Sequence, residues 1–149
     1  MLRKRSLVAL AVPLGLAVLS SCGGSSASSA ATTPPATSDV AGYQLLSPAA
    51  ADALLHEPPD GLVVLDVRTP EEFAAGHIAG AVELDLQGGA FETGVAALDP
   101  KSPYFVYCQS GNRSGQAVAY LQQQGFDSIY ELEGGIGAWQ AAALAVVEG

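Results

Sequence analysis

The sequence is poor in the residue types that build metal centres and disulfide frameworks. Its 149 residues contain two cysteines, Cys22 and Cys108, and two histidines, His56 and His77. Two cysteines cannot supply a disulfide framework or a cysteine-rich zinc module, and two histidines are too few for a histidine-based metal cluster. The sequence therefore predicts no metal site.

Positive charge is equally scarce. There are 6 Lys and Arg against 15 Asp and Glu, a formal net charge of −9, and three of the cations are Arg3, Lys4 and Arg5. A chain that begins at Cys22 keeps 3 basic against 15 acidic residues, a net charge of −12. This balance argues against binding to nucleic acid. The length allows one domain, and a hydrophobic fraction of 49% excludes wholesale disorder.

The first 22 residues have no apolar run long enough for a permanent membrane span, which needs about 20 residues. A basic start precedes an apolar stretch at 7–19 that Pro13 and Gly15 interrupt, as in a signal peptide. The segment Leu19-Ser20-Ser21-Cys22 resembles the bacterial lipoprotein box, in which the cysteine receives a lipid and becomes the new N-terminus. We expect an exported protein anchored to a membrane through Cys22. The alternative is an ordinary secretory signal, which would leave Cys22 as an unexplained thiol.

Residues 23–41 carry almost no bulky apolar side chain. Their composition of Ser, Ala, Thr, Gly and Pro is typical of a flexible linker. We therefore expect the folded domain to span residues 42–149.

In residues 42–149, short apolar runs alternate with longer helical patterns, which indicates an α/β fold with a parallel sheet. Ser47-Pro48 and Thr69-Pro70 are helix starts, and Glu72 completes a capping box with Thr69. We expect strands at 43–46, 62–67, 81–86, 104–107 and 129–132, and helices at 48–55, 91–98, 114–124 and 136–143, with a short helix from Pro70 that Gly76 closes. Gly134-Gly135 is predicted to form a tight turn between the last strand and the last helix.

The most informative segment runs from Cys108 to Ser114. It places a thiol directly after a buried strand and before a helix, at the end of a parallel sheet where ligands bind. Gly111 lets the backbone curl so that successive N–H groups form a cradle for negative charge, and Arg113 adds a cation. This setting favours thiolate over thiol. The alternative, a buried structural cysteine, would more naturally lie within the apolar strand.

Several ordered motifs make the chain resemble the rhodanese family over about residues 43–147. They are Leu65-Asp66-Val67-Arg68, Glu72-Phe73, Gly76-His77-Ile78-Ala79-Gly80-Ala81, the loop from Cys108 to Arg113 followed by Ser114, Gly125-Phe126, and Leu132-Glu133-Gly134-Gly135-Ile136 with Trp139. The resemblance implies a five-stranded parallel sheet with helices on both faces.

The resemblance also implies sulfurtransfer. Cys108 would take sulfur from a donor such as thiosulfate and hold it as a persulfide, and the loop would stabilise that anion. A small acceptor such as cyanide, or a protein thiol, would then take the sulfur, with no cofactor or metal. The implied catalytic residues are Cys108 and Arg113, and the implied substrate-binding loop is Gln109, Ser110, Gly111, Asn112 and Ser114. We expect a monomer.

Three other functions are weighed against this one. Cysteine phosphatases of this design place five residues between cysteine and arginine, whereas four separate Cys108 from Arg113. A rhodanese fold that only binds a partner is disfavoured by the intact loop. A carrier of sulfur or electrons for another exported protein stays open.

Residues near the loop are expected to be structural. Asp66 and Arg68 are predicted to form a charge-paired brace beneath it, His77 a hydrogen-bonded joint, and Trp139 part of the core. Gln109 stands where many family members carry arginine, so we expect weak attraction of a dianionic donor such as thiosulfate.

Overall fold

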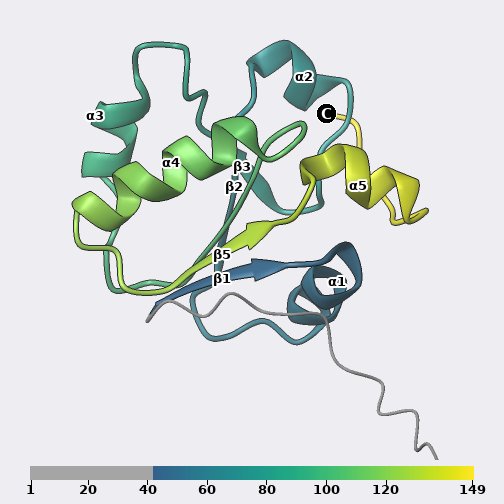
Figure 1. Ribbon diagram of the computed structural model, residues 1–149. Coiled ribbons are helices and arrows are strands. Elements are labelled where there is room, and N and C mark those ends of the chain that lie inside the picture. The colour runs from purple at the N-terminus through teal and green to yellow at the C-terminus, as the bar shows by residue number, and fades with distance from the viewer. Residues whose placement is uncertain (1–41) are drawn as a thin grey trace, which may run out of the picture. The chain divides into compact units, whose positions relative to one another are not determined.

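The computed structural model describes residues 42–149; the predicted signal peptide, linker and lipidation site at Cys22 lie outside the described residues. The centre of the domain is one five-stranded sheet with strand order β1-β5-β4-β2-β3 (Figure 1). All four neighbouring pairs are parallel, which confirms the predicted fold class. The strands are β1 (Tyr43–Leu46), β2 (Val63–Asp66), β3 (Ala81–Glu83), β4 (Tyr104–Tyr107) and β5 (Ile129–Leu132).

Helices cover both faces of this sheet (Figure 1). The core on one face includes side chains of α3 and α4, and the core on the other face includes side chains of α1 and α5. The helices are α1 (Pro48–His56), α2 (Pro70–Ala74), α3 (Phe91–Ala96), α4 (Asn112–Gln123) and α5 (Gly135–Ala141). None of the helices in residues 42–149 has the length and apolarity needed to cross a membrane.

Strand β4 lies at the centre of the sheet and is buried along its whole length. Tyr104 and Val106 pack into the core with α3 and α4, and Phe105 and Tyr107 pack into the core with α1 and α5. Side chains of a strand alternate between the two faces, so a central strand with helices on both sides must be apolar throughout. This strand ends at Cys108, and its burial fixes where the thiol lies.

The two helix starts read from the sequence are confirmed. The Ser47 side chain accepts a hydrogen bond from the Ala50 amide, and Thr69 forms a reciprocal capping box with Glu72. Such a box satisfies two backbone amides that a helix start leaves open. It also holds the Glu72 carboxylate at the start of α2.

Several boundaries differ from expectation: β2 is one residue shorter at each end than the expected 62–67, and α3 ends at Ala96 rather than at residue 98. Two other differences have local causes. Strand β3 ends at Glu83 rather than at residue 86, because the Glu83 carboxylate binds the Asp85 amide and turns the chain. Helix α4 begins at Asn112, two residues before the predicted start at Ser114, because Gly111 adopts a φ of 97° and caps it. The end of the cysteine loop is therefore the first turn of α4.

Helix α5 is also shorter than the expected 136–143. It spans Gly135–Ala141, and Ala143 beyond it has a φ of 59°. Left-handed backbone of this kind usually follows a helix at a glycine, which has no Cβ to clash. The chain thus ends the helix with an alanine in a strained conformation.

Candidate active site

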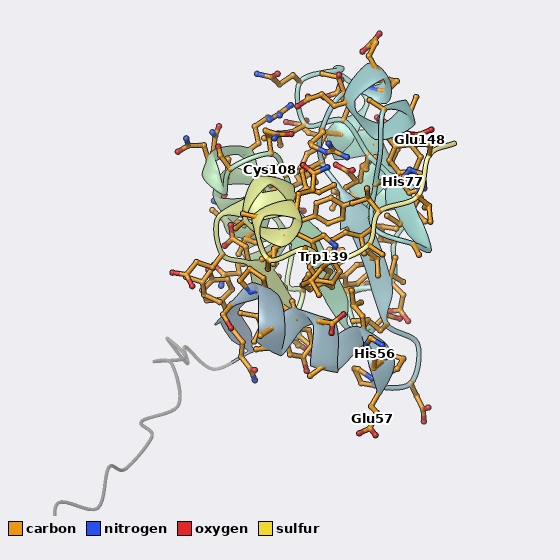
Figure 2. All side chains as sticks on the ribbon, turned by 90° about the vertical axis from the view of Figure 1, so that its right-hand side faces the viewer. His56, Glu57, His77, Cys108, Trp139 and Glu148 are labelled. Carbon is orange, nitrogen blue, oxygen red and sulfur yellow. The ribbon has the colours of Figure 1, made fainter. Side chains whose placement is uncertain are left out.

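Cys108 lies at the carboxyl end of β4, where the chain turns into α4. The residue is 1% exposed, so the sulfur is recessed inside its own loop, whereas Gln109 and Ser110 are exposed at the rim. Figure 2 shows His56 and Glu57 at the opposite end of the domain from Cys108. Neither His56 nor Glu57 can therefore take part in chemistry at this thiol.

The backbone around Cys108 points its amides inward because other groups hold its carbonyls. The Ile136 amide donates to the Cys108 carbonyl at 2.8 Å, and the Gly137 amide donates to the Gln109 carbonyl at 3.1 Å. With those carbonyls engaged by the start of α5, the next amides are free to face the sulfur. The Gly111 amide donates to Sγ at 3.1 Å. This arrangement is a cradle for an anionic sulfur.

Gly135 lets α5 approach the loop this closely. A Cβ built on Gly135 would lie 2.4 Å from the Cys108 carbonyl oxygen and 2.7 Å from the Ser110 nitrogen. The residue also has a φ of 62°, which other residues rarely adopt. The sequence predicted a tight turn at Gly134-Gly135, but not that this turn supports the cysteine loop.

The pKa of Cys108 lies below its ordinary value. Burial raises this pKa, but hydrogen bonds from the Ser114 side chain and from the backbone amides of Ser114, Ser110 and Gly111 outweigh the effect of burial. A thiol held in this way is nucleophilic at a lower pH than a free cysteine.

Arg113 does not stand alone as the cation of the loop. Its guanidinium donates two hydrogen bonds to Glu72, at 2.6 and 2.7 Å. This contact lowers the pKa of Glu72 to about 2. Both side chains stay largely shielded, at 18% exposed for Arg113 and 31% for Glu72. The charge that the sequence assigned to anion binding is thus already paired.

Asp66 and Arg68 form the buried pair that the sequence led us to expect. Arg68 binds both carboxylate oxygens of Asp66, at 2.6–3.0 Å, and its Nη2 donates to the Gly76 carbonyl at 2.7 Å. The two residues are 0% and 3% exposed. Through these hydrogen bonds Arg68 connects the end of β2 to the segment after α2.

His77 lies away from the sulfur (Figure 2). Its ring stacks on Phe73 with centroids 3.8 Å apart, and its Nδ1 is 3.1 Å from the Phe73 carbonyl oxygen. Its backbone exchanges two hydrogen bonds of 2.8 Å with Val147. These contacts fit the predicted joint. Trp139, at 3% exposed, lies in the core as predicted.

Two further residues next to the site were not found from the sequence. Glu131 on β5 is buried and accepts a hydrogen bond from Ser114, and Tyr43 on β1 donates to the same carboxylate. An acidic residue inside an apolar strand was the available signal. Within residues 42–149 no group of three or more His, Cys, Asp or Glu side chains is placed to hold a metal ion.

The sheet order and the cysteine loop together define a rhodanese-type domain. The family profile described as "Rhodanese-like domain" matches residues 47–142. The chain belongs to this family. It is 42% identical over 99 residues to "Thiosulfate sulfurtransferase GlpE" of Pseudomonas entomophila, which covers 66% of this chain and 86% of the relative. The predicted assignment to the rhodanese-type sulfurtransferases is thereby confirmed.

Solved structures agree with this assignment. A rhodanese-related protein from Thermoplasma volcanium has a TM-score of 0.61 and 31% identity, covering 70% of this chain and 97% of that one. A protein from Rhodopseudomonas palustris described as "Possible Tyrosine Phosphatase" has a TM-score of 0.59 and 30% identity, covering 69% and 83%. The same fold thus also carries a phosphatase description.

Proposed function

We propose that this protein carries sulfane sulfur on Cys108 as a persulfide between a small donor and a thiophilic acceptor. The observation that carries the proposal is the inward-facing backbone around the sulfur, with the Gly111 amide 3.1 Å from Sγ. The similarity to the protein named "Thiosulfate sulfurtransferase GlpE" supports sulfur transfer as the reaction.

In the first half-reaction the Cys108 thiolate attacks the outer sulfur of the donor. A sulfur–sulfur bond to Sγ forms, the bond inside the donor breaks, and with thiosulfate the leaving group is sulfite. The persulfide then bears the negative charge on its outer sulfur. The loop amides stabilise that charge without moving, because α5 holds their carbonyls.

In the second half-reaction the acceptor attacks the outer sulfur and regenerates the thiolate. Cyanide would leave as thiocyanate, and a thiolate acceptor would leave as a new persulfide. The cycle needs no cofactor, because the covalent intermediate stores the sulfur. The acceptor is a small molecule or a protein thiol, and we propose that the protein acts as a monomer.

The charge of a sulfur donor should determine how well this site attracts it. Arg113 is paired with Glu72, and Gln109 adds no charge at the rim, so a dianion meets little attraction in a domain of strongly negative net charge. We therefore propose that thiosulfate is a weak donor, and that less charged sulfane-sulfur donors are preferred.

We also propose that the protein is exported and held at a membrane by a lipid on Cys22. The support is the basic start, the apolar stretch at 7–19 and the Leu19-Ser20-Ser21-Cys22 motif. Expression with a labelled fatty acid tests this proposal: the chain should carry the label in the membrane fraction, and Cys22→Ala should lose it. If the parent chain is soluble and unlabelled, the lipid anchor is refuted, and an ordinary secretory signal is the remaining interpretation of residues 1–22.

Intact mass spectrometry tests sulfur transfer. In the Cys22→Ser chain Cys108 is the sole cysteine. Thiosulfate or an organic thiosulfonate should add the mass of one sulfur atom, and cyanide should remove it with the release of thiocyanate. A Cys108→Ser chain is the control and should not change. No mass gain with either donor, in a folded protein with an alkylatable thiol, would contradict the enzyme and favour the partner-binding module.

A further inference from the structure

The carboxylate of Glu131 is buried on β5 without a cation. The residue is 5% exposed. The three Lys and Arg side chains of residues 42–149 pair with other carboxylates: Arg68 with Asp66, Lys101 with Asp127, and Arg113 with Glu72. A buried ionised carboxylate needs compensation by hydrogen bonds. The sulfur-transfer cycle described above gives Glu131 no task.

Two hydroxyl groups hold this carboxylate. Tyr43 on β1 donates to Oε2 at 2.6 Å, and Ser114 on α4 donates to Oε1 at 2.6 Å. Burial, followed by the contact with Glu131, raises the pKa of Tyr43, so its phenol remains a donor. The Ser114 hydroxyl is the link to the active site, because its Oγ also lies 3.5 Å from Sγ of Cys108.

The Ser114 hydroxyl has a single proton to donate. When Glu131 is ionised, the short contact takes that proton, and Ser114 can only accept a hydrogen bond from the Cys108 thiol. When Cys108 is a thiolate, the serine can turn its proton to sulfur, away from Oε1 and from the Gly111 carbonyl oxygen, which lies 3.1 Å from the same Oγ. The 2.6 Å contact with Oε1 then requires a proton on the carboxyl group. The protonation states of Cys108 and Glu131 are thus coupled through one serine.

We propose that Glu131 is a positioning residue that receives the Cys108 proton through Ser114. The S–H bond of Cys108 breaks as an O–H bond to Ser114 forms. The original Ser114 proton moves to Oε1 of Glu131 at the same time. A thiol and a carboxylate become a thiolate and a carboxylic acid, with no change in total charge and no other reactant.

The surroundings of the network favour an internal acceptor. Cys108 is 1% exposed and its Sγ lies 3.5 Å from the Ser114 hydroxyl, so an internal acceptor for its proton is within reach. The titratable groups that face this network are Tyr43 from β1 and Cys108 at the end of β4, and the charged pair of Glu72 and Arg113 lies at the loop. The proposal rests on Cys108 as the nucleophile of the proposed function.

The test is the pH dependence of thiolate formation in the Cys22→Ser chain, followed by the rate of iodoacetamide alkylation and by thiolate absorbance. The parent should titrate in two steps with an intermediate plateau, because one proton is shared by two sites. Glu131→Gln keeps a hydrogen-bonding side chain of the same size but cannot receive a proton. It should titrate in one step, and its rate should fall about tenfold per pH unit below the midpoint.

Two further variants sharpen the result. Glu133→Gln removes an exposed carboxylate two residues away and should keep the two steps of the parent. Tyr43→Phe removes a hydrogen bond that favours ionised Glu131, so more of the proton should move onto Glu131. Its alkylation rate on the plateau should therefore rise by about 3-fold to 10-fold. A change in packing alone would not increase thiolate.

The outcomes separate cleanly. One-step titration of Glu131→Gln with a faster Tyr43→Phe supports the relay. Should Glu131→Gln not fold, a faster plateau in Tyr43→Phe still supports the relay, and an unchanged or slower one overturns it. Identical profiles for the parent, Glu131→Gln and Glu133→Gln also overturn it. No sulfur donor is used, so failure here is distinct from failure of sulfur transfer.

Discussion

The pairing of Arg113 with Glu72 predicts that removing one carboxylate improves the use of thiosulfate. In Glu72→Gln the side chain keeps its size, and glutamine still completes a capping box with Thr69, so α2 should be preserved. The change is therefore confined to charge. Arg113 loses its ionic partner and becomes available to an anion at the loop.

The size of the effect follows from simple electrostatics. Two unit charges about 4 Å apart interact by about 1 kcal/mol in water and about 4 kcal/mol at an effective dielectric constant of 20. Glu72 is 31% exposed, which places it nearer the aqueous limit, and the donor would lie farther from it than Arg113 does. We expect a gain of about 1 kcal/mol for a dianion, or a KM for thiosulfate about 5-fold lower.

The assay compares donors of different charge. Steady-state sulfur transfer to cyanide is measured with thiosulfate, a dianion, and with an organic thiosulfonate, a monoanion. The KM for the monoanion should fall by less, because the interaction energy scales with its charge. Glu71→Gln is the matched control: it removes the neighbouring exposed carboxylate, which makes no contact with Arg113. If the two variants show the same KM for both donors, the pair does not govern donor choice.

Three further predictions concern stability and the loop. Gly135→Ala should abolish most sulfur transfer, because its Cβ would lie 2.4 Å from the Cys108 carbonyl oxygen. The control is Gly125→Ala, where φ is 84° and no atom lies within 4 Å of the new Cβ; it should cost about 1 kcal/mol of stability and keep kcat. Ala143→Gly should raise the free energy of unfolding in urea by about 0.5–1 kcal/mol, because φ is 59° there; a loss would refute the strain. Since the pKa of Glu72 is lowered from 4.5 to about 2, the pair stabilises the fold above pH 4.5 and progressively less as the pH falls toward 2, so the stability difference between the parent and Glu72→Gln should shrink over that interval in urea titrations.

Much of the fold could be predicted from the sequence because its signals are local. The apolar run of β4 predicts a strand buried on both faces, and Thr69 with Glu72 predicts a helix start from four adjacent residues. The position of Cys108 between a strand and a helix predicts a loop at the end of the sheet. Each of these inferences depends on neighbours in the chain and on backbone geometry that short segments determine.

The parts that were missed depend on contacts between distant residues. Arg113 and Glu72 are 41 positions apart, and Tyr43 and Glu131 are 88 apart. Which side chains meet across such separations is decided by strand order and helix placement. The same limit applies to Gly135, whose turn was predicted but whose contact with the cysteine loop depends on how α5 packs.

The ion pairs of this domain explain why its active site depends on the backbone. Each cation of residues 42–149 is already bound to a carboxylate, so none is left with its full charge for the persulfide. Peptide amides are then the remaining donors, and they have two advantages in an acidic domain. Peptide amides carry no net charge, so nearby carboxylates do not form ion pairs with them. The contacts of α5 with the loop also fix the direction of these amides before sulfur arrives. The anion binding that we propose at Cys108 is thus a property of how two helices and a strand end meet, and it can persist in a chain whose net charge opposes it.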